Sequence, residues 1–302
     1  MTPPPVLGPS GRPGGAPPLA GQTGGGVTAL ATRTASTVVL LSVIGWIVLG
    51  APGWVFSAVA AAFVGIGLHE FFGMVERKGI FLYRNLGLIV GVAIPLSIHA
   101  GFETTPGWDL VLMGAAVLAL FLLQLARPDS SQTIVGIGTV LFGIFYVSWC
   151  FSFLVKIRFL EAPGIDGRWL AAFLILVTKM GDIGAYLIGS AIGRHLLIIR
   201  VSPSKTWEGT LGGLVCSVAA ALAVWKLVPL PIPVGHVVAL GVVLGVAALL
   251  GDLSESMVKR DCQVKDSGRV FPGIGGVLDL IDSLLFTAPL YYFYLRHFVF
   301  RG

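Results

Sequence analysis

The segment from Gly251 to Ser283, GDLSESMVKRDCQVKDSGRVFPGIGGVLDLIDS, concentrates side chains that could carry phosphate and metal chemistry. Its acidic and basic residues alternate: Asp252, Glu255, Asp261, Asp266, Asp279 and Asp282 with Lys259, Arg260, Lys265 and Arg269. Carboxylate oxygens suit a hard cation such as Mg²⁺, which binds through one or two carboxylates plus substrate phosphates. Lysine and arginine side chains would bind the remaining phosphate charge. The segment therefore indicates metal–phosphate chemistry, with a simply solvated loop as the alternative.

The spacing of these residues places them at the ends of two helices. One helix face, at positions i, i+3, i+4, i+7 and i+8, is occupied by Asp252, Glu255, Ser256, Lys259 and Arg260. Asp279 and Asp282 fall in the first turn of the next helix, where the helix dipole alone would favour a carboxylate such as Asp279. The dipole does not explain carboxylates at two helix ends joined by the glycine-rich FPGIGG, whose glycines permit close backbone approach.

A second polar segment, SPSKTWEG, runs from Ser202 to Gly209. Lys205-Thr206 is similar to the end of a phosphate-binding P-loop, but the upstream glycines of that motif are absent, so the motif is excluded. Thr206 is a plausible N-cap and Glu208 would lie in the first helical turn, which favours a phosphate cradle. A capped cytoplasmic loop explains the same residues equally well, so both interpretations stay open.

A third candidate lies inside an apolar stretch, where Lys179 and Asp182 are three residues apart. A charged residue near the centre of a membrane helix costs roughly 2.5–3.5 kcal/mol on insertion scales, so such residues usually face a site or a partner. The two side chains could instead simply pair with each other. His69 and Glu70 are a weaker case of the same kind.

The composition indicates which elements must position these residues. The chain of 302 residues is 55% apolar and 12% charged, with a mean hydropathy of +0.89. Soluble proteins carry roughly 25% charged residues, and apolar runs near the ~20 residues needed to cross a bilayer recur here. We therefore predict an all-α fold, a polytopic integral membrane helical bundle with about nine transmembrane helices.

The predicted spans are residues 35–51, 54–75, 85–101, 108–126, 133–155, 169–192, 208–228, 235–258 and 278–298. Residues 1–33 are rich in Pro and Gly. Such a segment cannot bury enough apolar surface to offset its ordering entropy, so we expect a disordered tail. Residues 34–302 would form one transmembrane domain.

Charge in the loops predicts the orientation. With nine spans, the basic loops at 77–84, 194–205 and 259–269 fall on one side, which the positive-inside rule makes cytoplasmic. Lys156 and Arg158 run against this pattern. The net charge of +5 is explained by this rule and by contact with membrane lipids, so we expect no nucleic-acid partner. Cys150, Cys216 and Cys262 show neither disulfide nor zinc-site spacing.

These segments together resemble the phosphatidate cytidylyltransferases, also called CDP-diacylglycerol synthases. The family signature is S-x-x-K-R-x4-K-D-x-G-x2-[LIF]-P-G-H-G-G-x-x-D-R-x-D. The matching residues are Ser256, Lys259, Arg260, Lys265, Asp266, Gly268, Phe271, Pro272, Gly273, Gly275, Gly276, Asp279 and Asp282. GDLSES, SPSKTWEG and the D-x-G-A-Y of Asp182 to Tyr186 match further family segments, and Glu70 resembles a glutamate in an early helix of that family.

Three positions depart from the family pattern. The histidine of P-G-H-G-G is replaced by Ile274 here, and the arginine of D-R-x-D is replaced by Leu280. The family usually has a polar residue directly after the aspartate of D-x-G-A-Y, and this chain has Ile183 there. Isoleucine and leucine neither hydrogen-bond nor carry charge, so a nucleotide or phosphate contact is either missing or supplied by other residues. All the acidic residues of the signature are retained.

The resemblance implies the reaction of CTP with phosphatidic acid to give CDP-diacylglycerol and pyrophosphate, with Mg²⁺ and, as an option, a second cation. It implies catalytic roles for Asp252, Lys259, Arg260, Lys265, Asp266 and Asp279, and metal binding by Asp252, Asp279 and Asp282. Substrate binding would fall to Asp182, Ser202, Ser204, Lys205, Thr206, Glu208 and Ser256. The expected setting is a bacterial inner or cell membrane, with the active site facing the cytoplasm and a homodimer as one option for the assembly.

Three other functions stay open on the sequence. The chain could use CTP or phosphate on another lipid phosphate, such as an isoprenoid phosphate, or be a catalytically impaired family member. It could also be a transporter whose charged residues form an ion path. Transporters often contain internal inverted repeats, and we find no such repeat.

Overall fold

The computed structural model describes residues 42–101, 107–160, 164, 166–228, 230–271 and 275–300. The chain divides into two compact units, Met1–Ser42 and Val43–Gly302, and the elements named below belong to the second. The predicted tail, residues 1–33, lies outside the described residues.

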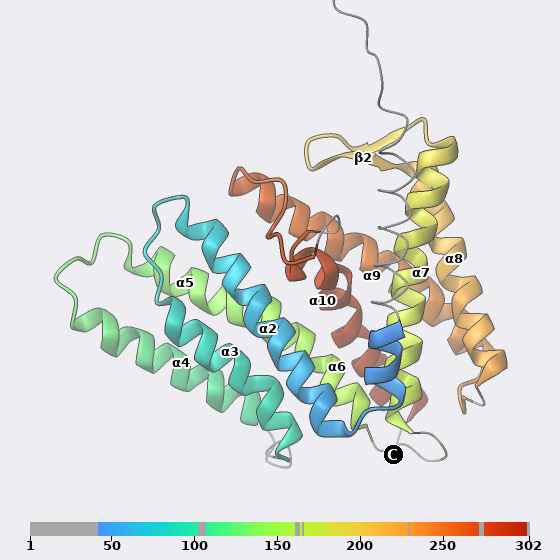
Figure 1. Cartoon of the computed structure of the whole chain (residues 1–302), viewed down its shortest axis with the longest axis horizontal. Helices are drawn as coiled ribbons and strands as arrows, with labels where there is room; N and C mark the ends of the chain where they lie inside the picture. Colours follow the sequence, from blue (N-terminus) through green and yellow to red (C-terminus); the bar gives the residue numbers. More distant parts are fainter. Residues whose placement is uncertain are drawn as a thin grey trace, which may run out of the picture. The chain divides into compact units, whose positions relative to one another are not determined.

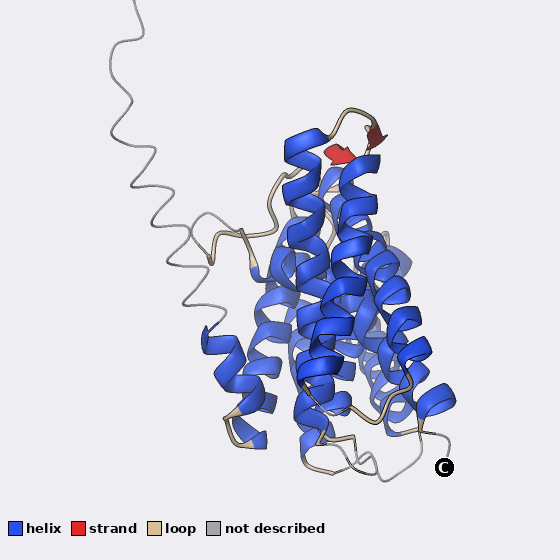
Figure 2. Ribbon diagram, turned by 90° about the vertical axis from the view of Figure 1, so that its right-hand side faces the viewer, coloured by secondary structure: helices blue, strands red, loops and turns tan. Residues whose placement is uncertain are grey.

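Helices make up almost all of the described structure (Figure 1). They are α2 (Gly53–Glu76), α3 (Arg84–His99), α4 (Trp108–Leu125), α5 (Thr133–Gly143), α6 (Cys150–Arg158), α7 (Gly167–Ile192), α8 (Trp207–Leu227), α9 (Val234–Asp261) and α10 (Val277–Tyr294). Two π-helical turns, η2 (Ile144–Trp149) and η3 (Leu295–Val299), extend α5 into α6 and continue α10. The strands β1 (Leu196–Ile198) and β2 (Ser202–Thr206) pair antiparallel, and Figure 2 shows this small hairpin at one end of the helices.

The all-α prediction is confirmed, and the chain is an integral membrane protein. Among the described residues, six helical segments are long and apolar enough to cross a membrane. They are α2, α4, the continuous run Thr133–Arg158, α7, α8 and α9, and α3 is a shorter apolar helix. Every predicted span from 54–75 onward coincides with a described helix, but the total of about nine spans is not confirmed by these segments.

The basic loops predicted to share one side do lie at one end of the helices. Lys78, just after α2, donates to Asp261 at the end of α9 over 2.6 Å, and this hydrogen bond raises the pKa of Lys78. Figure 1 places the loop after α2, the hairpin and the segment between α9 and α10 at this same end. The ends of α2, α7 and α9 and the starts of α8 and α10 therefore meet there.

The two basic residues that ran against the predicted charge pattern are paired with acids. Lys156 lies 2.7 Å from Asp109, and Arg158 lies 3.9 Å from Asp166. The side chains of Lys156 and Arg158 are both largely buried. Their charge is thus balanced within the protein, which explains why the positive-inside rule did not predict their position.

Glycines bring the helices around the polar end close together. Helices α7 and α8 form the most extensive contact of the fold. A Cβ on Gly213 of α8 would lie 2.8 Å from the carbonyl oxygen of Gly181 in α7. Small residues allow membrane helices to approach backbone to backbone, which is a main source of their packing energy. The packing of α7 on α8 therefore depends on glycine.

A second close approach, between α9 and α10, gives a testable prediction. A Cβ on Gly251 would lie 2.5 Å from the Asp282 carbonyl oxygen and 3.1 Å from the Ser283 Cα. Because both atoms are backbone, Gly251→Ala must separate the helices, and we expect a loss of about 1–3 kcal/mol in stability. Thermal unfolding of the detergent-solubilised protein measures this as a lower Tm.

Gly235 on the same helix is the matched control, because a Cβ there meets nothing within 4 Å. Gly235→Ala should leave the Tm unchanged or raise it, since alanine is the better helix former. An equal Tm for Gly251→Ala and Gly235→Ala would contradict the close approach of α9 and α10 at Gly251.

Candidate active site

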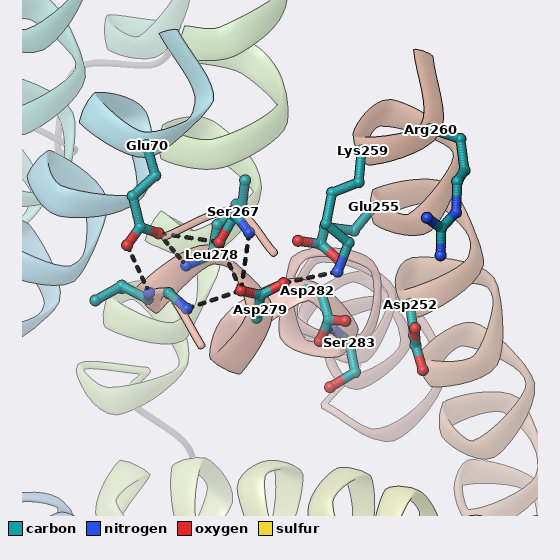
Figure 3. A network of polar contacts seen from close by, with 12 residues as sticks. Glu70, Asp252, Glu255, Lys259, Arg260, Ser267, Leu278, Asp279, Asp282 and Ser283 are labelled. Atoms are coloured by element: carbon teal, nitrogen blue, oxygen red, sulfur yellow. Dashed lines mark hydrogen bonds and ion pairs between the residues drawn. The ribbon is translucent and has the colours of Figure 1, made fainter. Parts of the chain in front are cut away.

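The N-terminus of α10 is held by a glutamate from α2. Glu70 is only 8% exposed and accepts hydrogen bonds from the backbone N–H of Val277, over 3.1 Å, and of Leu278, over 2.8 Å. The first N–H groups of a helix have no partner within the helix, and Glu70 supplies one. The hydroxyl of Ser267 also donates to Glu70 over 3.3 Å. Glu70 thereby fixes both α10 and the loop that precedes it (Figure 3).

Asp279, in the first turn of α10, is the centre of a polar network. Its Oδ2 accepts from the backbone N–H of Gly276 over 2.7 Å, and from the backbone N–H and the hydroxyl of Ser267 over 3.1 and 2.8 Å. Its Oδ1 accepts from Lys259 Nζ over 2.6 Å. Figure 3 shows Asp279 between Ser267 on one side and Lys259 on the other. The structure thus joins two predicted residues, Lys259 and Asp279, from α9 and α10.

Glu255 pairs with Lys259 from one turn earlier on α9. Its side chain is completely buried and forms an ion pair with Lys259 through Oε2. A buried carboxylate is costly unless it is paired, so the charge of Lys259 is what makes the burial tolerable. Lys259 therefore lies between two carboxylates, Glu255 and Asp279.

A second polar cluster surrounds Lys179, which lies within α7. Lys179 Nζ donates to Asp182 over 3.0 Å and to the Ser283 hydroxyl over 2.8 Å, and Ser283 donates to Asp182 over 2.9 Å. The alternative of simple pairing between Lys179 and Asp182 is thus correct in part, but the pair also joins α7 to α10 through the Ser283 hydroxyl.

The third feature is a pocket of about 380 Å³ between α7, α8, α9 and β2. Its polar wall contains the predicted residues Asp182, Ser204, Lys205, Thr206 and Asp252, and the rest of the lining is mainly glycine, alanine and leucine. Lys205 Nζ lies 2.5 Å from Asp252 Oδ2, which ties the hairpin to α9. This is the size of a small-molecule site, with few polar groups in an apolar wall.

The polar face predicted for α9 is divided between two directions. Glu255 and Lys259 point towards α10, whereas Asp252 pairs with the hairpin. Arg260 also turns to the hairpin and donates from Nε to the carbonyl of Val201 over 3.4 Å. Figure 3 shows Arg260 and Asp252 away from the Lys259–Asp279 contact.

The remaining predicted residues have local contacts of their own. Thr206 is the N-cap of α8 as predicted, accepting from Gly209 N–H over 3.1 Å. Glu208 accepts from the backbone of Arg194 and His195 and contacts the His195 ring over 2.6 Å, which closes the turn after α7. Lys265 and Asp266 line a separate pocket. Ser202 is buried in β2, and Ser256 is half-buried on α9.

The site residues that the sequence reasoning missed are Glu255, Ser267, Ser283 and the full role of Glu70. Glu255 carried one signal, its spacing of four residues from Lys259, which allows pairing along a helix. Ser267 and Ser283 carried none, because serine is common in loops and helices without any role at a site.

The carboxylates fit a cation only in combination with a substrate. Within the described residues, no group of three His, Cys, Asp or Glu side chains could hold a metal by itself. Mg²⁺, however, commonly binds through one or two carboxylates and completes its shell with phosphates and water. Asp252 meets that requirement, because it lies on the pocket wall with a single described partner, Lys205. A cation at Asp279 would have to displace Lys259 from Oδ1.

Comparison with known proteins shows the family of the chain. The sequence model of the cytidylyltransferase family matches residues 31–298, which is most of the chain and includes every cluster described above. The chain belongs to the cytidylyltransferase family. It is a nucleotidyltransferase, in keeping with carboxylates and lysines placed around a pocket at the end of a membrane bundle.

Curated cytidylyltransferases share about a third of its residues. A phosphatidate cytidylyltransferase of Synechocystis is 36% identical over 270 residues, covering 80% of this chain and 89% of the relative. The phosphatidate cytidylyltransferase of Bacillus subtilis is 32% identical over 243 residues, with the same two coverages of 80% and 89%. The chloroplastic phosphatidate cytidylyltransferase 5 of Arabidopsis thaliana is 36% identical over 284 residues, covering 84% and 68%.

The positions at which this cytidylyltransferase departs from the family signature lie in different settings. Leu280 is half-buried in the first turn of α10, and Ile183 is exposed on α7. Neither therefore takes part in the polar networks. Ile274 lies outside the described residues.

Proposed function

We propose that this cytidylyltransferase transfers the cytidylyl group of CTP to phosphatidic acid, giving CDP-diacylglycerol and pyrophosphate. The observation that carries the proposal is the Lys205–Asp252 pair in the wall of the pocket between α7, α8 and α9. The pocket combines charged groups with an apolar wall at the end of three membrane helices. A lipid phosphate needs that combination, because its head is anionic and its acyl chains stay in the bilayer.

The reaction forms one bond and breaks one. A phosphate oxygen of the lipid attacks the α-phosphorus of CTP, and the bond from that phosphorus to the bridging oxygen of the β-phosphate breaks, so that pyrophosphate leaves with the electron pair. The nucleophile is already anionic, so no strong base is required. The protein has to align the two substrates and neutralise their charge, which is the usual basis of phosphoryl-transfer catalysis.

The chain's own residues would divide this task between the two helix ends. Lys205 would bind the lipid phosphate from the hairpin, and Lys259 would face the reacting phosphates from α9. Glu255 and Asp279 hold the Lys259 ammonium group in place from two sides. Such fixed positive charge stabilises the transition state because it needs no rearrangement during the reaction.

A bound Mg²⁺ would neutralise phosphate charge and polarise the phosphorus–oxygen bond. We propose Asp252 as its principal protein ligand, with Asp282 and Asp182 nearby on α10 and α7. The other predicted ligand, Asp279, would join only after releasing Lys259.

We further propose that the polar end of the bundle faces the cytoplasm of a bacterial cell. We also propose that the chain crosses the membrane about nine times, through the six clear spans, α3, α10 and the span predicted from the sequence at residues 35–51. The basic loops gathered at one end support this orientation. Cysteine labelling of Arg200→Cys and of Leu227→Cys in intact cells would test it. A membrane-impermeant reagent should label only Leu227→Cys, and the reverse result would overturn the orientation.

A direct assay tests the function. Purified protein is incubated with labelled CTP and a panel containing phosphatidic acid, an isoprenoid phosphate and no lipid. We expect CDP-diacylglycerol from phosphatidic acid only, loss of that product with EDTA, and its return when excess Mg²⁺ is added. Turnover with the isoprenoid phosphate alone would replace the proposed substrate. CTP-independent solute movement in proteoliposomes, without lipid product, would overturn the enzymatic proposal.

A further inference from the structure

A second pocket, separate from the one between α7, α8 and α9, is lined by three cations, of which only Lys265 belongs to the residues that the family resemblance implies to be catalytic. It has a volume of about 570 Å³ and lies between the end of α2 and the loop after α9. Arg77, the C-cap of α2, contributes on one side, and Lys265, Asp266, Ser267 and Arg269 contribute from the loop. Below it is called the basic pocket.

The basic pocket carries unbalanced positive charge. Three cations, Arg77, Lys265 and Arg269, face a single carboxylate, Asp266. None of the three has an ion pair within the described part of the chain. The neighbouring cations do, since Lys78 pairs with Asp261 and Arg84 with Glu76. The excess charge in the pocket is therefore suited to a multiply charged anion.

The pocket is held in shape by contacts outside it. Glu70, seven residues before Arg77, accepts from Ser267 of the pocket wall and from the start of α10. The Lys78–Asp261 pair joins the residue after Arg77 to the end of α9. Glu70 in particular fixes the loop side of the pocket to α2, so little ordering would be needed for an anion to bind.

The pocket is also connected directly to the Asp279 network. Ser267 lies in its wall and donates to Asp279 from both its backbone N–H and its hydroxyl. Asp279 in turn holds Lys259. An anion in the basic pocket would therefore lie beside the residues proposed to face the reacting phosphates.

The exposure of the pocket distinguishes between its two conceivable phosphate ligands. Arg77, Lys265 and Arg269 are all exposed, and the lining is mostly polar, whereas the pocket between α7, α8 and α9 contains Leu214 and Leu249. A water-soluble polyphosphate fits the first pocket, and a lipid fits the second.

We propose that the basic pocket binds the β- and γ-phosphates of CTP and the pyrophosphate formed from them, with Arg77 as a binding residue. This assignment rests on the proposed function. In this assignment the two substrates occupy separate pockets on either side of Lys259. Pyrophosphate can then leave towards water while the lipid product stays in the membrane.

Kinetics of Arg77→Gln in the full-length protein test the assignment. We expect the KM for CTP and the inhibition constant of pyrophosphate each to rise about tenfold, because one charged contact is lost. The KM for phosphatidic acid should stay within about twofold, because the lipid occupies the other pocket. Arg269→Gln should raise the same two constants. Arg77→Lys, which keeps the positive charge, should raise them less than Arg77→Gln does.

Arg200→Gln is the matched control, because Arg200 is exposed between β1 and β2 and lines neither pocket. It should leave all these constants unchanged. If Arg77→Gln behaves like Arg200→Gln, the assignment is wrong. If it raises the KM for phosphatidic acid instead, the basic pocket binds the lipid phosphate.

A binding measurement separates failure of this assignment from failure of the proposed function. Titration of the wild-type protein and Arg77→Gln with pyrophosphate alone requires no turnover. We expect about tenfold weaker binding to the variant, with an unchanged Tm, because Arg77 is exposed. Equal affinity would overturn the assignment even in a protein that makes no CDP-diacylglycerol, and absence of that product would overturn only the proposed function.

Discussion

Asp279→Asn should abolish nearly all turnover. The amide keeps the size of the carboxylate, but it places an N–H₂ group or a neutral oxygen where Lys259 now meets a full negative charge over 2.6 Å. Lys259 would then be held by Glu255 alone and would move away from the substrate phosphates. Removing one preorganised charge from an active site typically costs about 10²–10³ in kcat, and we expect at least a hundredfold fall here.

The measurement is kcat for CDP-diacylglycerol formation, with the Tm followed in parallel. Asp129→Asn is the control, because Asp129 is exposed in the loop between α4 and α5 and its carboxylate accepts from the backbone N–H of Ser131, outside both proposed pockets. It should leave kcat within about twofold. Substantial activity in Asp279→Asn would show that the protein does not depend on this network and would favour a binding or scaffold role.

Asp252→Asn should be comparably damaging for a different reason. It removes the partner of Lys205, so the hairpin loses its tie to α9, and it removes the proposed principal ligand of Mg²⁺. We expect kcat to fall by about 10² and the Mg²⁺ concentration for half-maximal activity to rise about tenfold.

Asp261 provides a control on the same helix. It pairs with Lys78 at the surface and its side chain is 71% exposed, and exposed pairs contribute only about 0–1 kcal/mol. Asp261→Asn should therefore keep both kcat and the Mg²⁺ requirement. An unchanged Mg²⁺ requirement in Asp252→Asn would remove Asp252 from the proposed metal site.

Local sequence patterns predicted the helices well because each membrane span has to be a long apolar run. The β1–β2 hairpin was not predicted. Its strands span only three and five residues, too few to show an alternating pattern. The N-cap role of Thr206 was predicted correctly, since capping depends on the residue itself and on its immediate neighbours.

The site was predictable only as far as it depends on spacing along one helix. Asp252, Glu255 and Lys259 were placed on one face, but the packing of α10 against α9 decides that Glu255 and Lys259 turn inward while Asp252 meets the hairpin. The contact between Glu70 and Ser267 joins residues 197 positions apart. No local pattern encodes such a pair, because it exists only once α2 and α10 lie side by side.

The glycine contact between α7 and α8 has a consequence for how this enzyme could diversify. Gly181, Gly189, Gly209 and Gly213 also line the pocket between α7, α8 and α9, so much of its wall is main chain, whose position follows from the spacing of the helix axes. None of these positions carries a charged group. An added methyl group on Gly209 or Gly213 would lie 2.8 Å from a backbone carbonyl oxygen of α7, so the wall of the pocket cannot change at these positions unless the two helices move apart. The space offered to the lipid is therefore tied to the packing of α7 on α8.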